Sequence, residues 1–114
     1  MAAGDVTITA DQTFGRGFKG DLRMIMGTVV LDGENPTPVL LTNYLSAIFA
    51  AQATMSGSAA TDADPNQITA LINGTSLDIY AWKVTTGGAA GNPTEIASTD
   101  NTRVINWLAI GPKA

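Results

Sequence analysis

Alternating hydrophobic and polar positions recur along most of the chain, and this pattern is typical of half-buried β-strands. The alternation is clearest in Ser76–Thr85, where one parity begins with Leu77 and Ile79 and the other carries Tyr80 and Trp82. Further segments with strand character are 6–10, 18–30, 67–73, 94–98 and 103–110. With a further strand in the ambiguous segment Thr42–Met55, they predict seven or eight short strands.

Turn-forming residues separate these segments. Asn73-Gly74 lies between two alternating runs and predicts a β-hairpin with a type I′ turn. The run Asp32–Pro38 is rich in Gly, Asn and Pro, so it is predicted to stop the preceding strand. Gly27 lies where the strand at 18–30 becomes apolar on both faces, which predicts a bulge or bend there.

The segment Thr42–Met55 is ambiguous between helix and strand. Tyr44, Leu45, Ile48 and Phe49 fall on one helical face. From Ile48 to Met55, however, the chain also fits period 2, with the even-numbered residues opposing the odd-numbered ones. Because strand signals surround it, we expect one helical turn at Thr42–Ser46 followed by a strand.

These elements predict an all-β fold, namely an antiparallel, jelly-roll-like β-sandwich with at most one short helix. The 114 residues fit a single domain. Residues 1–16 contain few core residues and are predicted to form an extended N-terminal arm, with residues 17–114 forming the sandwich.

Composition excludes several function classes. The chain has no cysteine and no histidine, so disulfides, thiolate or histidine metal sites and the usual catalytic triads are ruled out. We therefore expect no enzyme activity, no cofactor and no metal. The net charge of −4 argues against nucleic-acid binding. No run of 18 apolar residues is present and residues 1–5 lack a basic segment, so neither a membrane span nor a signal peptide is expected.

Charged residues make up only 14% of the chain, which suits a protein covered by neighbours in an assembly. Half of the basic charge lies in Arg16, Lys19 and Arg23, interrupted by Asp21. As a nucleic-acid patch this cluster is weak, but it can serve as an electrostatic contact for a protein partner.

Two short motifs have simpler structural explanations. Gly15–Gly20 matches G-x-G-x-x-G but continues as a strand, whereas a dinucleotide site needs a helix at this point. Asp62-x-Asp64-x-Asn66 has the spacing that starts a calcium loop, but the glycine and glutamate that should follow are absent, so a solvated turn is expected.

The aromatic residues Tyr80, Trp82 and Trp107 leave two roles open. They can form a stacking platform for sugars or bases, or they can be core or subunit-interface anchors. The late strands are apolar on both parities, so the second face must meet another subunit, a partner, or the loop at 33–46.

Two segments carry a family resemblance. Gly17–Val29, followed by a Pro-containing loop and Tyr44-Leu45-Ser46, resembles small head proteins of tailed bacteriophages, and Arg103–Gly111 is similar to their C-terminal strand. These proteins are capsid decoration, or cement, proteins. Their usual glycine-rich loop near residues 33–40 is here Asn35-Pro36-Thr37-Pro38.

The resemblance implies a non-enzymatic structural protein on the outer surface of the virion head. It implies a β-sandwich, often a homotrimer, that binds the major capsid protein and stabilises the capsid lattice. In that setting Arg16, Lys19 and Arg23 are predicted to contact the capsid. Two alternatives remain: another phage component, such as a tail-tube, neck or fibre module, or a carbohydrate-binding β-sandwich.

Overall fold

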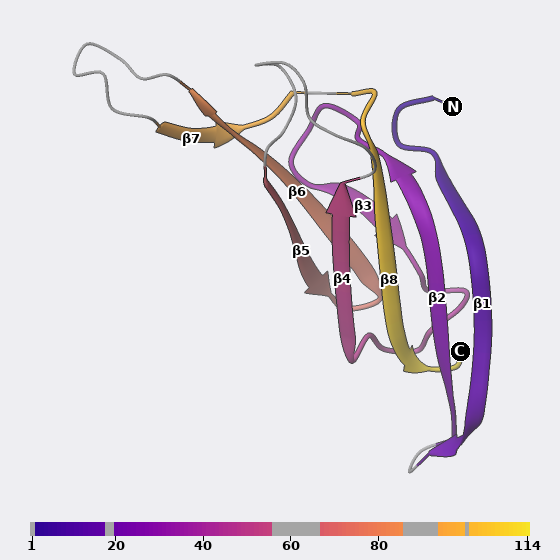
Figure 1. The fold of residues 1–114 in the computed structure, drawn as a ribbon. Coiled ribbons are helices and arrows are strands. Elements are labelled where there is room, and N and C mark those ends of the chain that lie inside the picture. The colour runs from indigo at the N-terminus through magenta and orange to yellow at the C-terminus, as the bar shows by residue number, and fades with distance from the viewer. Residues whose placement is uncertain (1, 18–19, 56–66, 86–93, 100) are drawn as a thin grey trace.

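The computed structural model describes residues 2–17, 20–55, 67–85, 94–99 and 101–114. These residues form strands and no helix (Figure 1). The strands are β1 (Val6–Gly17), β2 (Gly20–Val30), β3 (Thr37–Leu40), β4 (Ala50–Met55), β5 (Gln67–Asn73), β6 (Ser76–Thr85), β7 (Thr94–Ala97) and β8 (Val104–Pro112). The all-β prediction is confirmed.

The strands form two antiparallel sheets. The first has the order β1-β2-β8-β4, and the second has the order β3-β6-β5 with β7 also paired to β6. Figure 1 shows the two sheets as the layers of a sandwich, with β1 and β2 reaching the end of the molecule opposite β7. The β-sandwich expected from the sequence is therefore present, with β1–β2 and β5–β6 as hairpins within single sheets.

The second sheet is organised around β6. Ile79 and Trp82 of this strand both pair with β5 on one side. On the other side Ile79 pairs with β3 and Trp82 pairs with β7. Strands β3 and β7 therefore share one edge of β6 and occupy different ends of it.

A side chain fills the gap between β3 and β7. Asn35 Nδ2 donates to the carbonyl oxygen of Ala81 at 2.9 Å, and the Ala81 amide donates to Asn35 Oδ1 at 3.1 Å. The amide of Asn35 thus satisfies backbone groups of β6 where no strand lies beside them. The stop predicted at Asp32–Pro38 is confirmed, because β2 ends at Val30. The last two residues of the run already belong to β3, which begins at Thr37.

The hairpin at Asn73-Gly74 is confirmed, and its turn differs in type from the prediction. Asn73 pairs with Ser76, so the two turn residues are Gly74 and Thr75. Gly74 has φ of +63°, and no non-glycine residue described has a positive φ. A positive φ at the first turn position alone is the pattern of type II′ rather than type I′.

The segment predicted as an extended N-terminal arm is extended, but it lies within the first sheet. Strand β1 pairs with β2 from Val6 to Gly17, so residues 6–10 are the start of a longer strand. Pairing satisfies the backbone groups on one edge of β1. Because β1 is the outermost strand, its other edge faces away from the sheet.

The bulge predicted at Gly27 lies on the neighbouring strand. Gly27 pairs with Ile8, and the next pair joins Met26 to Ala10, so Thr9 is the extra residue in β1. The Thr9 hydroxyl donates to the Met26 carbonyl oxygen at 3.2 Å. Gly27 is instead required by close packing, because a Cβ here would lie 2.1 Å from the Thr7 carbonyl oxygen.

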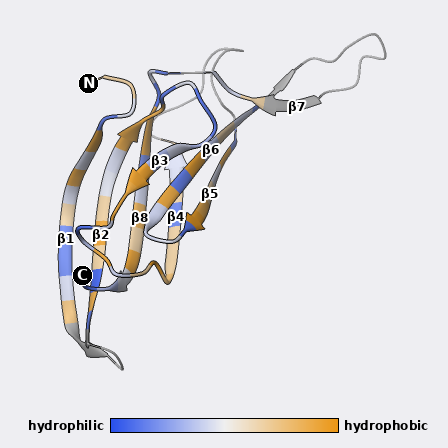
Figure 2. Ribbon diagram, turned by 180° about the vertical axis from the view of Figure 1, so that it is seen from behind, coloured by the Kyte–Doolittle hydropathy of each residue, from blue (hydrophilic) through white to orange (hydrophobic). Residues whose placement is uncertain are grey.

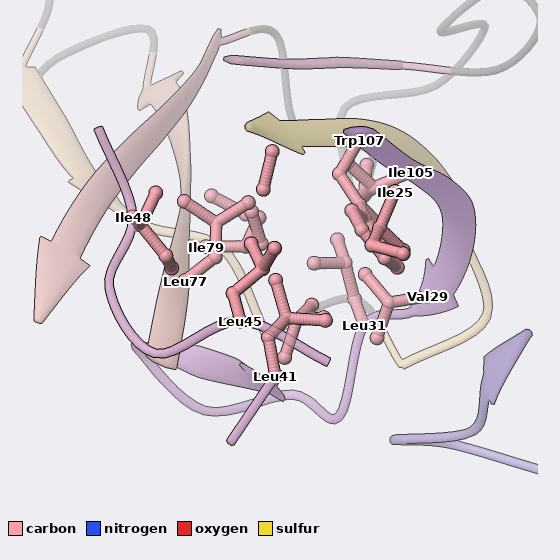
Figure 3. Packing of buried hydrophobic residues seen from close by; sticks show 13 residues of the cluster. Ile25, Val29, Leu31, Leu41, Leu45, Ile48, Leu77, Ile79, Ile105 and Trp107 are labelled. Atoms are coloured by element: carbon pink, nitrogen blue, oxygen red, sulfur yellow. The ribbon is translucent and has the colours of Figure 1, made fainter. Parts of the chain in front are cut away.

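The core lies between the sheets and is closed by the segment that joins β3 to β4 (Figure 3). One parity of β2 and β8 faces one parity of β3 and β6, as the alternation of Leu77 and Ile79 predicted. Between the strands, the Leu45 amide donates to the Leu41 carbonyl oxygen at 2.9 Å, which closes one helical turn near the predicted position. The buried hydrophobic residues are Ile25, Val29, Leu31, Val39, Leu41, Leu45, Ile48, Leu77, Ile79, Ala81, Ile105, Trp107 and Ala109.

Candidate interaction surfaces

The described residues contain no group of three acidic side chains that could hold a metal ion. Within the same part of the chain, no helix has the length and apolarity needed to cross a membrane. The calcium-like segment Asp62–Asn66 lies outside the described residues. Three places on the described part of the structure are candidate interaction surfaces. They are an arginine cluster, an uncharged sheet face and an aromatic row.

The arginine cluster consists of Arg23 and two residues that it contacts, Asp11 and Tyr44. Arg23 Nε donates to Asp11 Oδ1 at 2.7 Å, and Arg23 Nη2 donates to Asp11 Oδ2. The guanidinium carbon lies 5.3 Å from the ring centroid of Tyr44, and Nη1 donates to the Tyr44 carbonyl oxygen at 3.2 Å. The bidentate pair and the ring contact tie β1, β2 and the turn at residues 42–45 together.

Arg23 lies on the core side of β2, at the end of the first sheet. It shares its parity with Ile25 and Val29, which are fully buried. Arg23 is one of the three basic residues predicted from the sequence to contact the capsid. Its guanidinium instead already has a carboxylate partner in Asp11.

Arg16 and Lys19 are the other two residues predicted to contact the capsid, and the structure describes less of them than of Arg23. Arg16 lies on β1 and pairs with Asp21 of β2, and its side chain is outside the described part. Lys19 lies outside the described residues. A capsid contact by Arg16 and Lys19 stays a prediction.

The hydrogen bonds from Arg23 hold the pKa of the Asp11 carboxyl below its usual value of 3.8, and the positive charges of Arg23 and Lys113 act in the same direction. A carboxylate whose pKa is lowered by folding stabilises the fold while it is ionised. That contribution is complete above the unfolded pKa and is lost as the pH falls through the lower, folded pKa.

We expect Asp11→Asn to lower the free energy of unfolding slightly at pH 7. Near pH 2 we expect the variant and the wild type to be equally stable, because the Asp11 carboxylate no longer contributes there. Asp11 is exposed enough for solvent to weaken the pair, with 35% of its side-chain surface accessible. Urea denaturation of both proteins between pH 7 and pH 2 measures this. Glu34→Gln, which also removes one exposed carboxylate, is the control. A difference between wild type and Asp11→Asn that persists unchanged at pH 2 would contradict the assignment.

The outer face of the first sheet carries no charged side chain among the described strand residues. Its centre is formed by Met24 and Met26 of β2 beside Ile110 and Leu108 of β8, which pair directly. Met26 is 39% exposed. The hydrophobic stretches of β2 and β8 are visible in Figure 2. The remaining residues on this parity are Thr7, Ala10, Gln12, Phe14, Leu22, Thr28, Val30, Ala50, Gln52, Thr54, Val104, Asn106 and Pro112.

A hollow in this face is lined by Met26, Gln52, Thr54, Asn106 and Leu108. The sequence signal for this surface was the second apolar parity of the late strands. The loop at 33–46 does not account for it, because Leu41 and Leu45 of that loop turn into the core. We define the residues of this sheet face as the uncharged face.

The three aromatic residues singled out in the sequence separate into two groups. Trp107 is 3% exposed and belongs to the core, where its indole Nε1 has no hydrogen-bond partner among the described residues. Tyr80 and Trp82 lie on the opposite parity of β6 from the core residue Ile79, so they occupy the outer face of the second sheet. Trp107 is therefore a core residue, whereas Tyr80 and Trp82 are partly exposed residues of the sheet surface.

Comparison with known proteins adds no relative to this description. No family model matches the chain, and no curated protein or solved structure shows significant similarity to it. The class that the structure itself defines is an all-β, two-sheet antiparallel sandwich.

Proposed function

We propose that this protein is a non-enzymatic structural protein of a phage virion that binds the outside of the head and stabilises the capsid lattice. The uncharged face is the observation that carries the proposal. A four-stranded sheet in a lone protein usually presents polar and charged side chains on its solvent side. Here the corresponding side is apolar at its centre and uncharged throughout its described strand residues, which suits an interface.

The mechanism that follows is burial of apolar surface between the uncharged face and the capsid, repeated at many positions of the capsid shell. Complete burial of a fully exposed methionine or leucine side chain contributes roughly 1.5–3 kcal/mol. Met26 is 39% exposed, so covering it contributes only a part of that amount. Each copy that bridges two major capsid subunits makes their separation harder, and many copies act together through multivalency. The exposed edge of β1 offers backbone donors and acceptors as a second contact.

The resemblance of Gly17–Val29 and Arg103–Gly111 to phage decoration proteins supports the same proposal, because residues 20–29 and 104–111 of these segments lie in β2 and β8. The two strands are neighbours at the centre of the first sheet. The similarity therefore concentrates on the strands that build the uncharged face.

Localisation on phage particles tests the function. Antibodies raised against the purified protein are applied to virions from the phage stock whose genome encodes the chain, and gold-labelled antibody is located by electron microscopy. We expect label over the outer surface of the head. Label confined to the tail, neck or fibres would support another particle component instead, and unlabelled virions would refute a virion protein.

We expect Met26→Lys to reduce the number of copies bound to undecorated heads by about tenfold or more, because a buried lysine must be desolvated where a methionine was stabilising. Cosedimentation with the heads measures the bound fraction. Asn43→Lys adds the same charge at an exposed turn residue away from this face and serves as the control. Equal binding by the two variants would exclude the uncharged face as the contact.

The mass in solution separates two uses of the same face. A homotrimer of the 11.7 kDa chain, measured by light scattering, fits the threefold positions of an icosahedral shell. If Met26→Lys converts that trimer to monomers, the uncharged face contacts another copy of the chain. If the variant stays trimeric but leaves the heads, the face contacts the capsid.

A further inference from the structure

The outer face of the second sheet carries a row of two aromatic rings. Tyr80 and Trp82 lie two residues apart on β6, so their side chains project from the same face. Their ring planes are within 6° of parallel and their centroids are 6.0 Å apart. Neither side chain belongs to the hydrophobic core, and both remain partly exposed. The two rings therefore form a stacked aromatic pair on this face.

Hydrogen-bonding side chains flank the rings on β5. Gln67 pairs with Trp82 and Thr69 pairs with Tyr80, and both polar residues are exposed. Directly paired residues of antiparallel strands present their side chains on the same face. An amide and a hydroxyl therefore lie beside the rings, where they can donate to and accept from sugar hydroxyl groups. On the opposite side of Trp82 the paired residue is Ala97, which has a small side chain.

The charge at this site favours a neutral ligand. The next outward residue of β6 is Asp78, which is 7% exposed. Its carboxylate accepts hydrogen bonds from Ser76 Oγ at 2.7 Å and from Asn73 Nδ2 at 3.2 Å. No basic side chain is described on the outward face of β5 or β6 beside the rings. A nucleic acid would bring phosphates to this site without a cation to meet them.

We propose that Tyr80 and Trp82, with Gln67 and Thr69, form a binding site for a neutral glycan, with a sugar ring stacked on the indole. This site lies on the sheet opposite the uncharged face, so one molecule can attach to a particle through the first sheet and bind a glycan through the second. The glycan site does not depend on the proposed capsid contact. Failure of either one leaves the other standing.

The test uses the intact protein on a printed array of neutral oligosaccharides built from glucose, galactose, mannose and N-acetylglucosamine. The strongest binder is then titrated in solution by calorimetry. We expect saturable binding that Trp82→Ala weakens by about tenfold or more, because loss of a stacked aromatic anchor usually dominates the affinity of such a site. Trp82→Tyr keeps a ring and is expected to retain most of the binding.

Phe49→Ala is the matched control, because Phe49 is 62% exposed and lies outside the aromatic row. Circular dichroism verifies that each variant keeps the β spectrum, and Trp82→Tyr retains a test of the ring if Trp82→Ala does not fold. Absence of binding across the array, or equal affinity of Trp82→Ala and wild type, would overturn the proposal. Binding of oligo-dT that depends on Trp82, without glycan binding, would replace it with a base-stacking site.

Discussion

Leu45→Ala is expected to lower the free energy of unfolding by about 3–5 kcal/mol, the range for truncating a buried leucine in a rigid core. Leu45 is fully buried although it lies in the connection between β3 and β4. Its backbone is fixed on both sides, by the bond from its amide to Leu41 and by its bridge to Lys113. Such a held position cannot collapse easily around the missing methyl groups. A loss of this size is a large share of the roughly 5–15 kcal/mol that stabilises a domain.

The matched control lies five residues upstream. Leu40→Ala makes the same chemical change at a side chain that is 69% exposed. Its effect on stability is expected to stay within about 0.5 kcal/mol. The midpoints and slopes of urea denaturation curves of the two variants measure the difference. Similar losses in both would mean that the segment joining β3 and β4 does not close the core.

The local alternation of residues was enough to predict the strands that dominate the fold. In β6, Leu77 and Ile79 face the core as their parity predicted, and the hairpin at Asn73-Gly74 joins β5 to β6. These features depend on neighbours in the sequence and on a turn that glycine permits. Their information is therefore contained within a few residues.

Strand β3 could not be predicted in this way. Pro36 and Pro38 flank its first residue, and prolines so close together indicate a turn. The edge of β6 tolerates them, because Pro38 lies on a short edge strand and needs no donor on its outer side. The same edge is completed by the side chain of Asn35, a contact across 46 residues of sequence.

Prediction of the candidate sites would have required the register between strands that are distant in the sequence. The partnership of Arg23 with Asp11 follows from the pairing of β1 with β2 and from the register shifts on either side of residues 10–13. No local pattern encodes those shifts, so the ion pair of Arg23 with Asp11 could not be predicted from the sequence. Tyr80 and Trp82 were candidates as aromatic residues, together with Trp107, and the alternation of their strand placed the two on one parity. Their parallel orientation and their neighbours on β5 became visible only with the sheet assembled.

Gly27→Ala is the second change with a large expected effect, and it tests how tightly the first sheet is packed. A Cβ at Gly27 would lie 2.1 Å from the Thr7 carbonyl oxygen and 2.7 Å from Cζ2 of Trp107. The carbonyl belongs to β1 beside the bulge at Thr9, so it moves only if the pairing of β1 with β2 changes. The indole is held in the core. Because neither neighbour can move away easily, we expect Gly27→Ala to lower the free energy of unfolding by about 3 kcal/mol or more, at the upper end of overpacking effects.

Gly74→Ala separates this steric effect from the conformational cost of replacing glycine. Gly74 has φ of +63° and no atom within 4 Å of an added Cβ, so its substitution carries only the left-handed backbone penalty of roughly 1–2 kcal/mol. Gly27 has no positive φ, so any loss of stability in Gly27→Ala must come from the steric collision alone. Urea denaturation should therefore rank Gly27→Ala as the less stable variant. Hydrogen exchange should also show faster exchange of β1 amides in Gly27→Ala, since the collision acts through the Thr7 carbonyl. If Gly27→Ala is as stable as wild type, β1 is free to shift on the sheet, and the bulge at Thr9 is not held by the packing of Trp107 against Gly27.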